Sequence, residues 1–412
     1  MNLHLEPLTR KPDPRRYATA AATSDESRAG IELSIVMPCL NEAETVGACV
    51  AIAIDFLQQH GIDGEVIVAD NGSKDDSRAI AGREGARIVD VPLRGYGAAL
   101  QAAIAAARGR YVIIGDSDGS YDFAQLMPFL ATLRGGAQLV MGNRFSGRIY
   151  AGAMPGLHRY LGNPLLSFIG RLFFKNSIGD YYCGLRGFSR EAIVALDLRM
   201  TGMEFAIEMV VRAVLAQLEI VEIPTTLSRD GRSGRSHLRT WRDGWRTLRF
   251  LLLYSPQWLF LYPGLTLIVL GLGTSLLLLP GPLPIGHGVT LDLHTMLVSC
   301  AACVVGVQSV CFALIARDYA IARKLIPPAT RDWQPFRRFT LERMLLLGSA
   351  IFLGGIAGLA WALLAWSEVH FGDLGYSRVI REVILSVTAL STGAQLILSG
   401  FLAGVIAIGH RD

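Results

Sequence analysis

The sequence is short of cysteine and of net charge. Its 412 residues include six cysteines, and none has the repeated spacing of a zinc site or of a disulfide framework. Cys300 and Cys303 form one close pair, but they lie in an uncharged apolar run, where we interpret both as small packing residues. The formal net charge of +4 is small for this length. These features indicate reduced cysteines and no nucleic-acid partner.

The first 30 residues lack the apolar core of a signal peptide and are rich in Pro, Arg, Thr, Ser and Ala. We expect residues 1–30 to be a disordered tail, and the globular domain that follows to stay in the cytoplasm. Residues 31–236 mix charged and apolar side chains as a soluble domain does, whereas residues 257–412 contain long uncharged runs. The composition therefore predicts a soluble catalytic half followed by a membrane half.

Four runs in the second half lack Lys, Arg, Asp and Glu, and each can cross a hydrocarbon core of about 30 Å as a helix. The predicted spans are about 257–279, 294–316, 344–366 and 383–408. The segment 317–343 contains seven basic residues, 280–293 contains none, and 367–382 contains two. The positive-inside rule places the middle loop, and with it both ends of the chain, in the cytoplasm of a cell-membrane protein.

Two segments have an apolar face beside basic residues. Residues 237–256 place Trp241 and Trp245 among arginines just before the first span, which favours a juxtamembrane amphipathic helix lying in the membrane surface. Residues 157–174 have a similar pattern, and either pack on the domain core or lie at the interface. Basic residues cluster beside these apolar runs, which indicates anionic membrane lipid as a partner.

From residue 31 onward, short apolar runs alternate with helical stretches. The predicted strands are 33–37, 65–69, 86–91 and 111–115, and the predicted helices between them are 43–60, 75–84 and 96–108. Near-continuous apolar strands separated by helices predict an α/β fold with a mainly parallel sheet covered on both faces. Such sheets bind ligands at the carboxyl ends of their strands, at a switch point.

Polar clusters follow three of these strands, at 38–42, 70–76 and 116–122. Asp116-Ser117-Asp118 places two carboxylates two residues apart, which suits Mg²⁺ or Mn²⁺ bridging to phosphates. Asp70 ends its strand where a carboxylate can accept from a base or a ribose, although Asp70-Asn71-Gly72-Ser73 also suits a turn. Gly95-Tyr96-Gly97 opens a helix and permits close approach of a ligand.

Five segments in fixed order resemble the GT-A domain of family 2 glycosyltransferases over about residues 31–240. They are SIVMPCLNEAETV, VIVADNGSKDDS, RGYGAALQAA, YVIIGDSDGSYD and GNRFSG. The closer resemblance is to the dolichol-phosphate mannose synthases and the bacterial polyprenyl-phosphate glucosyltransferases. It implies a Rossmann-like nucleotide-sugar domain joined to a helical transmembrane domain. The Q-x-x-R-W motif of processive synthases is missing, which argues against chain extension.

The resemblance also implies roles for individual residues. Its nucleotide pocket consists of Pro38, Leu40, Glu42 and Asp70. We also assign Asn71, Gly95 and Ser117, which lie close to the predicted strand and helix ends, to the nucleotide-sugar site. Asp116 and Asp118 serve the ribose-diphosphate and the metal, and Ser120 stands where the mannose synthases have a third ligand, Gln. Arg144 contacts phosphates of donor or acceptor, and Asp180, Gly184 and Arg186 resemble the acceptor-side segment.

Two further departures from the family pattern affect the predicted site. Asn71 stands where the family usually has a second aspartate. The basic stretch from residue 229 to residue 237 can be aligned with the family in two ways. Arg229, Arg232 and Arg235 are therefore candidates, as a group, for binding the acceptor phosphate.

The predicted function is metal-dependent transfer of a hexose, glucose or mannose, from a UDP- or GDP-sugar to polyprenyl phosphate. A phosphomonoester carries roughly −1.5 to −2 charges and is already a nucleophile, so no strong base is needed. Direct displacement would invert the anomeric centre. One alternative is a transferase that acts on a glycan or lipid hydroxyl, with Asp180 or Glu204 as base. A second is a non-catalytic scaffold or translocator. The sequence is compatible with a homo-oligomer but does not fix the base, the sugar, the prenyl length or the oligomeric state.

Overall fold

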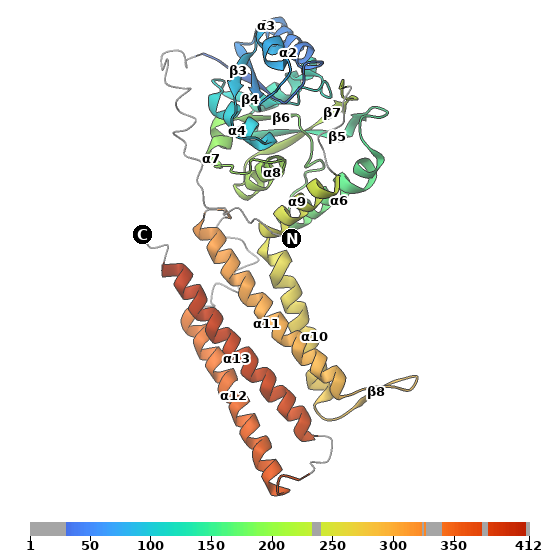
Figure 1. Cartoon of the computed structure of the whole chain (residues 1–412), viewed down its shortest axis with the longest axis vertical. Helices are drawn as coiled ribbons and strands as arrows, with labels where there is room; N and C mark the ends of the chain where they lie inside the picture. The colour runs from blue at the N-terminus through green and yellow to red at the C-terminus, as the bar shows by residue number, and fades with distance from the viewer. Residues whose placement is uncertain (1–29, 233–239, 324, 327–339, 373–377, 409–412) are drawn as a thin grey trace. The chain divides into compact units, whose positions relative to one another are not determined.

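The computed structural model describes residues 30–232, 240–323, 325–326, 340–372 and 378–408. The chain divides into two compact units, Met1–Phe250 and Leu251–Asp412, each of which is considered by itself (Figure 1). The predicted tail lies outside the described residues except for Gly30, as do Arg235 and the first residues of the predicted juxtamembrane helix.

Within the described residues, the first unit is built on one seven-stranded sheet with the order β3-β2-β1-β4-β6-β5-β7. The strands are β1 (Leu33–Cys39), β2 (Gly64–Asp70), β3 (Arg87–Asp90), β4 (Tyr111–Ile114), β5 (Leu139–Ile149), β6 (Arg186–Ser189) and β7 (Ile220–Leu227). Strand β6 runs antiparallel to both neighbours, and the other pairings are parallel. The prediction of a mainly parallel sheet is confirmed.

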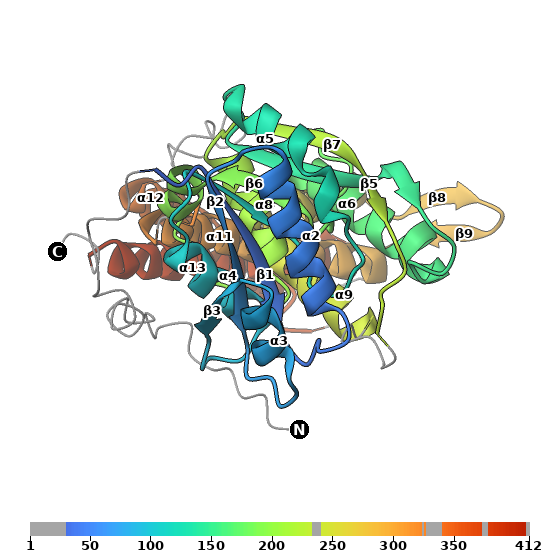
Figure 2. The ribbon, with the colours of Figure 1, turned by 90° about the horizontal axis from the view of Figure 1, so that it is seen from above.

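Helices cover both faces of this sheet because its central strands are apolar on both sides. Alternate residues of β1, including Leu33, Ile35 and Met37, share a buried cluster with α2 (Val46–Gln59) and α5 (Met127–Arg134). Figure 2 shows helix α2, in blue, in front of the sheet. Helix α4 (Tyr96–Ala106) packs on β1 and β2, and α8 (Phe205–Leu215) packs on α4. The remaining short helices are α3 (Ser77–Arg83), η2 (Phe123–Gln125) and α7 (Arg190–Ala195).

The order of the strands places a switch point between β1 and β4. The chain passes from β1 outward to β2 and β3, then returns to add β4 on the other side of β1. Residues Val36 and Ile114 are paired in register, so the carboxyl ends of β1 and β4 lie side by side. The polar clusters that follow these strands therefore meet at one edge, as the sequence predicted.

The segment 158–174 forms a helix that is apolar on two faces. It begins as a π-helical turn, η3 (His158–Gly162), and continues as α6 (Asn163–Phe174). Its inner face buries Ser167, Gly170 and Phe173. An apolar stripe remains exposed on the outside: Leu157, Tyr160, Leu161, Leu165, Phe168 and Leu172. Packing on the core and an exposed apolar face thus coexist in one helix.

The second unit contains four helices long and apolar enough to span a membrane, by length and composition, among the described residues. They are η4 with α10 (Gln257–Leu261, Tyr262–Leu278), α11 (Leu293–Ala322), α12 (Leu341–Glu368) and α13 (Arg378–Ile408). The sequence prediction missed how far α11 continues past residue 316: it ends at Ala322 and includes the ion pair between Arg317 and Asp318. It also missed the hairpin β8 (Leu283–Gly286) and β9 (Val289–Leu291), which Figure 1 shows after α10.

Glycines let these helices approach closely in pairs. A Cβ on Gly306 of α11 would lie 2.7 Å from the carbonyl oxygen of Gly264 on α10, and one on Gly393 of α13 would lie 2.7 Å from that of Gly348 on α12. In lipid, helices are not driven together by the hydrophobic effect, and close packing of this kind stabilises their association instead. Cys300 is buried beside Ser275, with Oγ and Sγ 3.3 Å apart, which agrees with its interpretation as a packing residue.

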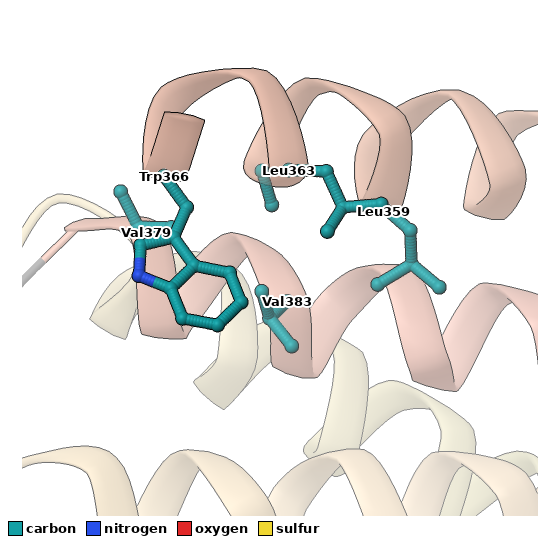
Figure 3. A pocket seen from close by; sticks show the side chains of 6 residues that line it. Leu359, Leu363, Trp366, Val379 and Val383 are labelled. Carbon is teal, nitrogen blue, oxygen red and sulfur yellow. The ribbon is translucent and has the colours of Figure 1, made fainter. Parts of the chain in front are cut away.

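A pocket of about 320 Å³ lies between α12 and α13, and Figure 3 shows its apolar lining. It is lined by Leu359, Ala362, Leu363, Trp366, Val379 and Val383. Nothing in this lining could bind a charged diphosphate or neutralise its charge. The charged side chains that could do so lie in the first unit, at the edge of the sheet.

Candidate active site

The acidic loop after β4 is fastened to the end of β1. The hydroxyl of Ser117 donates to the carbonyl oxygen of Pro38 at 2.7 Å, and Ser117 is almost fully buried. This bond fixes Asp116 and Asp118 on either side of a rigid residue. Pro38 lies on β1, and Leu40 is half-buried in the loop beyond it. Ser117 therefore positions the acidic pair, which is a more specific role than the sequence indicated.

Asp116 lies where a negative charge is costly. Burial and the neighbouring Asp118 carboxylate raise the pKa of Asp116 to about 7. The hydroxyl of Tyr96 donates to Asp116 at 3.2 Å. On the other side, a Cβ at Gly184 would stand 2.7 Å from the Asp116 carboxylate, so only glycine leaves room there. Two carboxylates in this position attract a cation.

Asp118 meets two residues from distant parts of the chain. Its Oδ2 atom accepts from Arg232 at 3.1 Å, and its Oδ1 atom accepts from the backbone N–H of Ser120 at 3.0 Å. The same guanidinium reaches Glu42, with Nε 2.9 Å from Oε2 and Nη2 2.7 Å from Oε1. Arg232 thus joins the loop after β1 to the loop after β4. Although burial alone would lower its pKa, the Asp118 and Glu42 carboxylates raise the pKa of Arg232 above its usual value.

The predicted third metal ligand has a structural role in this turn. Ser120 donates its N–H to Asp118, its carbonyl oxygen accepts from the N–H of Ser228 at 2.9 Å, and its side chain is buried. Among the described residues, no group of three His, Cys, Asp or Glu side chains converges as a ready metal site. Asp116 and Asp118 would leave most positions of a hard cation to phosphate oxygens and water, as Mg²⁺ commonly accepts.

Asp70 and Asn71 form the turn at the end of β2. Asp70 is buried and accepts from the N–H groups of Gly72 and Ser73 at 3.2–3.3 Å. The Asn71 amide donates to the carbonyl oxygens of Val91 and Leu93, at 3.3 and 2.8 Å, and accepts from Gly95 N–H at 2.7 Å. An aspartate could not make the two donations. This explains in physical terms why asparagine departs from the family pattern here.

Asn71→Asp should therefore destabilise the loop from residue 91 to residue 95. A carboxylate would face two carbonyl oxygens without a proton to give, which costs about 1–3 kcal/mol. Hydrogen exchange of the amides from residue 91 to residue 97 is the measurement, and faster exchange in the variant is expected. Asn71→Gln is the control for a change in side-chain size, because it lengthens the side chain and keeps the amide group. Equal protection in Asn71→Asp and the wild type would contradict this role.

Gly95 has no space for a side chain because another backbone crosses it. Its φ is +142°, and a Cβ there would lie 2.1 Å from the carbonyl oxygen of Thr201. A Cβ added to Gly97 would lie 2.2 Å from the carbonyl oxygen of Met200. The segment after α7 therefore packs directly on the start of α4. The close approach expected of Gly95-Tyr96-Gly97 is to protein backbone.

Arg144 and Asp180 form a buried ion pair. The Arg144 Nε and Nη2 atoms donate to the two Asp180 oxygens at 2.7 and 2.9 Å, and Asp180 is completely buried. Asp180 also accepts from the N–H groups of Arg144 and Tyr182, at 3.2 and 3.1 Å. The pair fixes strand β5 to the segment before β6. Asp180 is fully engaged, and Arg144 presents only its remaining guanidinium edge.

Two other predicted acceptor-side residues also have protein partners. Arg186 is fully buried and donates to the carbonyl oxygens of Tyr181, Cys183 and Ala206. Glu204, the alternative base, pairs with Arg246 at 3.6 Å. Arg229 is exposed on the segment that leads to Arg232. Arg235, the third candidate for the acceptor phosphate, lies outside the described residues.

The family models divide the chain as the structure does. The glycosyl transferase family 2 model matches residues 34–196, and the glycosyltransferase family 2 C-terminal transmembrane region matches residues 314–407. The sheet, with its acidic pair at the switch point, is that of a GT-A nucleotide-sugar domain. The chain belongs to glycosyltransferase family 2 and is a membrane protein, which confirms the predicted fold and enzyme class.

The chain is similar to curated proteins and to a solved structure, and the first relative below supports the family assignment. A low-salt glycan biosynthesis hexosyltransferase of Haloferax volcanii is 35% identical over 378 residues, which cover 90% of this chain and 88% of the relative. The dolichyl-phosphate hexose transferase of the same organism is 29% identical over 195 residues, covering 47% of this chain and 81% of that protein. Glucosyl-3-phosphoglycerate synthase from Mycobacterium tuberculosis, solved with Mg²⁺ and UDP, is 25% identical over 55% of this chain and 79% of that chain, with a TM-score of 0.43.

Proposed function

We propose that this enzyme transfers a hexose from a nucleoside-diphosphate sugar to polyprenyl phosphate at the cytoplasmic membrane face, with inversion of the anomeric centre. One observation carries the proposal: Arg232 joins Glu42 to Asp118, beside Asp116, at the switch point of a GT-A sheet in a chain that also has helices long and apolar enough to span a membrane. The dolichyl-phosphate hexose transferase among the relatives supports this class of acceptor. The base and the sugar stay as alternatives, UDP or GDP and glucose or mannose.

The loops after β1, β2 and β4 would bind the donor. Asp70, Asn71 and Pro38 lie at neighbouring strand ends, and the base and the ribose would bind between these loops. Asp116 and Asp118 fit Mg²⁺ or Mn²⁺ by the chemistry of their oxygens and by the charge they concentrate. A divalent cation there would neutralise charge on the departing nucleoside diphosphate. The fixed Ser117–Pro38 contact would keep the acidic pair in place as the sugar leaves.

A phosphate acceptor explains why carboxylate bases are scarce on the acceptor side. Both oxygens of Asp180 are held by Arg144, and Glu204 is paired with Arg246. Neither is placed as a free base for a hydroxyl nucleophile. A phosphomonoester needs orientation and charge neutralisation instead, which arginines supply through paired N–H donors. Arg229, Arg232 and the outer edge of Arg144 are the described candidates.

A polyprenyl chain stays in the bilayer because each buried CH₂ contributes about 0.8 kcal/mol. The reaction must then occur at the membrane surface, and the first unit has apolar surface suited to it. In the stripe on η3 and α6, the Tyr160 side chain is 77% exposed. Helix α9 (Thr240–Leu253) leaves Trp241 82% and Trp245 61% exposed. Aromatic rings beside arginines are typical of helices lying in the headgroup region.

The topology gives a prediction that does not depend on activity. With the catalytic unit in the cytoplasm, position 286 in the β8–β9 hairpin is external, and position 330, outside the described residues, is cytoplasmic. Gly286→Cys should react with a membrane-impermeant thiol reagent in intact cells, whereas Thr330→Cys should react only after permeabilisation. The protein without either substitution is the control, because it shows how much reagent the six native cysteines take up. Labelling of position 330 but not 286 in intact cells would invert the model.

The donor screen tests the proposed function. Purified full-length protein in detergent with Mn²⁺ is given UDP-glucose, UDP-mannose, GDP-mannose or GDP-glucose, with and without polyprenyl phosphate. One donor should be consumed rapidly only when the lipid phosphate is present, and its sugar should appear in the organic phase. Donor consumption that no lipid phosphate stimulates would contradict the proposal.

A further inference from the structure

Arg232 occupies the carboxylates that a divalent cation would need. Its guanidinium grips Glu42 with two nitrogen atoms, at 2.9 and 2.7 Å, and reaches Asp118 with one of them at 3.1 Å. The Glu42 side chain is 4% exposed and that of Asp118 is 13% exposed, so water screens this contact poorly. One positive charge thus stands between carboxylates from two loops.

Both oxygens of Asp118 are already engaged in this arrangement. Oδ1 accepts from the N–H of Ser120, which is part of the turn and cannot move away alone. Oδ2 is the oxygen held by Arg232. A divalent cation bound to Oδ2 would share that atom with a guanidinium, and the two positive charges would repel each other across a poorly solvated space. A cation at Oδ2 would therefore compete with Arg232 for that oxygen.

The backbone just before Arg232 is held by hydrogen bonds that do not involve the Arg232 side chain. The N–H of Gly231 donates to the carbonyl oxygen of Asp118 at 2.9 Å, and the N–H of Ser228 donates to that of Ser120 at 2.9 Å. These two bonds pair the segment before Arg232 with the acidic loop. A displaced guanidinium would therefore stay next to the metal loop, tethered at its Cα, and would need a new anionic partner.

We propose that Arg232 is a cation surrogate that the divalent cation displaces, and that the displaced guanidinium then binds the phosphate of the acceptor. The inference rests on the proposed function and adds the order in which the cation, the donor and the acceptor bind. Until the cation and the donor are bound, Arg232 is held by Glu42 and Asp118, so the acceptor phosphate lacks one of its arginines. The lipid acceptor then binds well only to a loaded site, which ties its recognition to the presence of donor. Arg232 is a positioning residue for both ligands.

Mn²⁺ binding to the full-length protein without donor or lipid tests the first step. Free Mn²⁺ is measured by electron paramagnetic resonance during titration of the wild type, Arg232→Gln and Arg229→Gln. Removing the competing charge should tighten Mn²⁺ binding by about 10-fold in Arg232→Gln, the size of a typical coupling between two sites. Arg229→Gln removes the same charge three residues earlier and should change the affinity little.

The expected sign separates this role from a purely structural one. If Arg232 only held the loops together, Arg232→Gln would loosen the carboxylates, and Mn²⁺ would bind equally or more weakly. Either result overturns the inference, as does tightening of the same size in Arg229→Gln. A failure of Mn²⁺ to bind any of the three proteins would overturn it together with the metal assignment. The apparent Tm of each protein shows whether the fold is retained, and Arg232→Lys provides a second variant that keeps charge without the two-nitrogen grip.

The second step is tested by acceptor binding. Polyprenyl phosphate in detergent should bind the wild type at least about 10-fold more tightly when Mn²⁺ and the nucleoside diphosphate of the preferred donor are present. Arg232→Gln should lose most of that gain. Equal acceptor affinity with and without the cation and nucleotide would contradict the order. These binding measurements are independent of the transfer assay. They can contradict the binding order while sugar transfer to polyprenyl phosphate is observed, and they can support the order while no transfer is observed.

Discussion

Asp118→Asn should lower kcat/KM for sugar transfer by at least about 100-fold, the scale seen when a preorganised electrostatic contact to the transition state is removed. The Asp118 carboxylate supplies negative charge to the cation, and its Oδ2 atom holds Arg232 at 3.1 Å only until the cation binds. An amide of the same shape keeps the turn but not the charge. Steady-state transfer, with Mn²⁺ varied at saturating donor, is the measurement.

A matched control distinguishes charge from disturbance of the loop. Asp122 lies on the same loop, accepts from the N–H of Ala124 at 2.9 Å and caps η2. Asp122→Asn removes the same charge four residues later and should keep most of the activity. Wild-type activity of Asp118→Asn in a buffer containing a chelator would remove the metal site from the account.

Asp180→Ala should destabilise the first unit by about 3–5 kcal/mol, since it leaves the Arg144 guanidinium buried without its partner. Asp180 is fully buried and holds Arg144 through two short hydrogen bonds. In a unit of this size the loss corresponds to a fall in apparent Tm of roughly 10 °C. The measurement is thermal unfolding of the purified protein, followed by near-ultraviolet circular dichroism.

The surface pair between Arg134 and Glu32 is the control for this prediction. It has the same paired geometry, at 2.7 and 2.8 Å, but its side chains are 43% and 30% exposed. Glu32→Ala should cost no more than about 1 kcal/mol. Equal losses in the two variants would show that burial of the Arg144–Asp180 pair has no special effect.

The central strands and the position of the site follow directly from sequence. Runs such as Leu33–Met37 and Tyr111–Gly115 are apolar apart from Ser34, which favours strands covered on both faces. The polar residues after them then had to meet at one edge. The four spans were predictable for a similar reason, because lipid excludes charge over a fixed length. The helices extend beyond the apolar runs because hydrogen bonding within a helix does not stop where hydrophobicity does.

The partners of the charged residues could not be predicted, because they are separated by long stretches of chain. Arg232 is 190 residues from Glu42, and Arg144 is 36 residues from Asp180. The sequence identified each of these side chains as functional without indicating which pairs form. The sequence showed only that Asn71 departs from the family pattern. The structure gives the reason, because the Asn71 amide forms hydrogen bonds with three backbone groups. Strands β5, β6 and β7 were not predicted from the sequence. Strand β6 (Arg186–Ser189) has a single large apolar side chain, Phe188, so no apolar run marks it.

The central claim is that the nucleophile is a lipid phosphate, and a comparison of two acceptors tests it most directly. Polyprenyl phosphate and the matching polyprenol differ only in the phosphate group. Each is given in the same detergent, with Mn²⁺ and the preferred donor, to the purified full-length protein, and the labelled sugar entering the organic phase is measured. The account predicts rapid transfer to the phosphate and at least about 100-fold slower transfer to the alcohol, because the two candidate bases for a hydroxyl, Asp180 and Glu204, are each paired with an arginine. Equal transfer to both, or transfer to the alcohol alone, would contradict it.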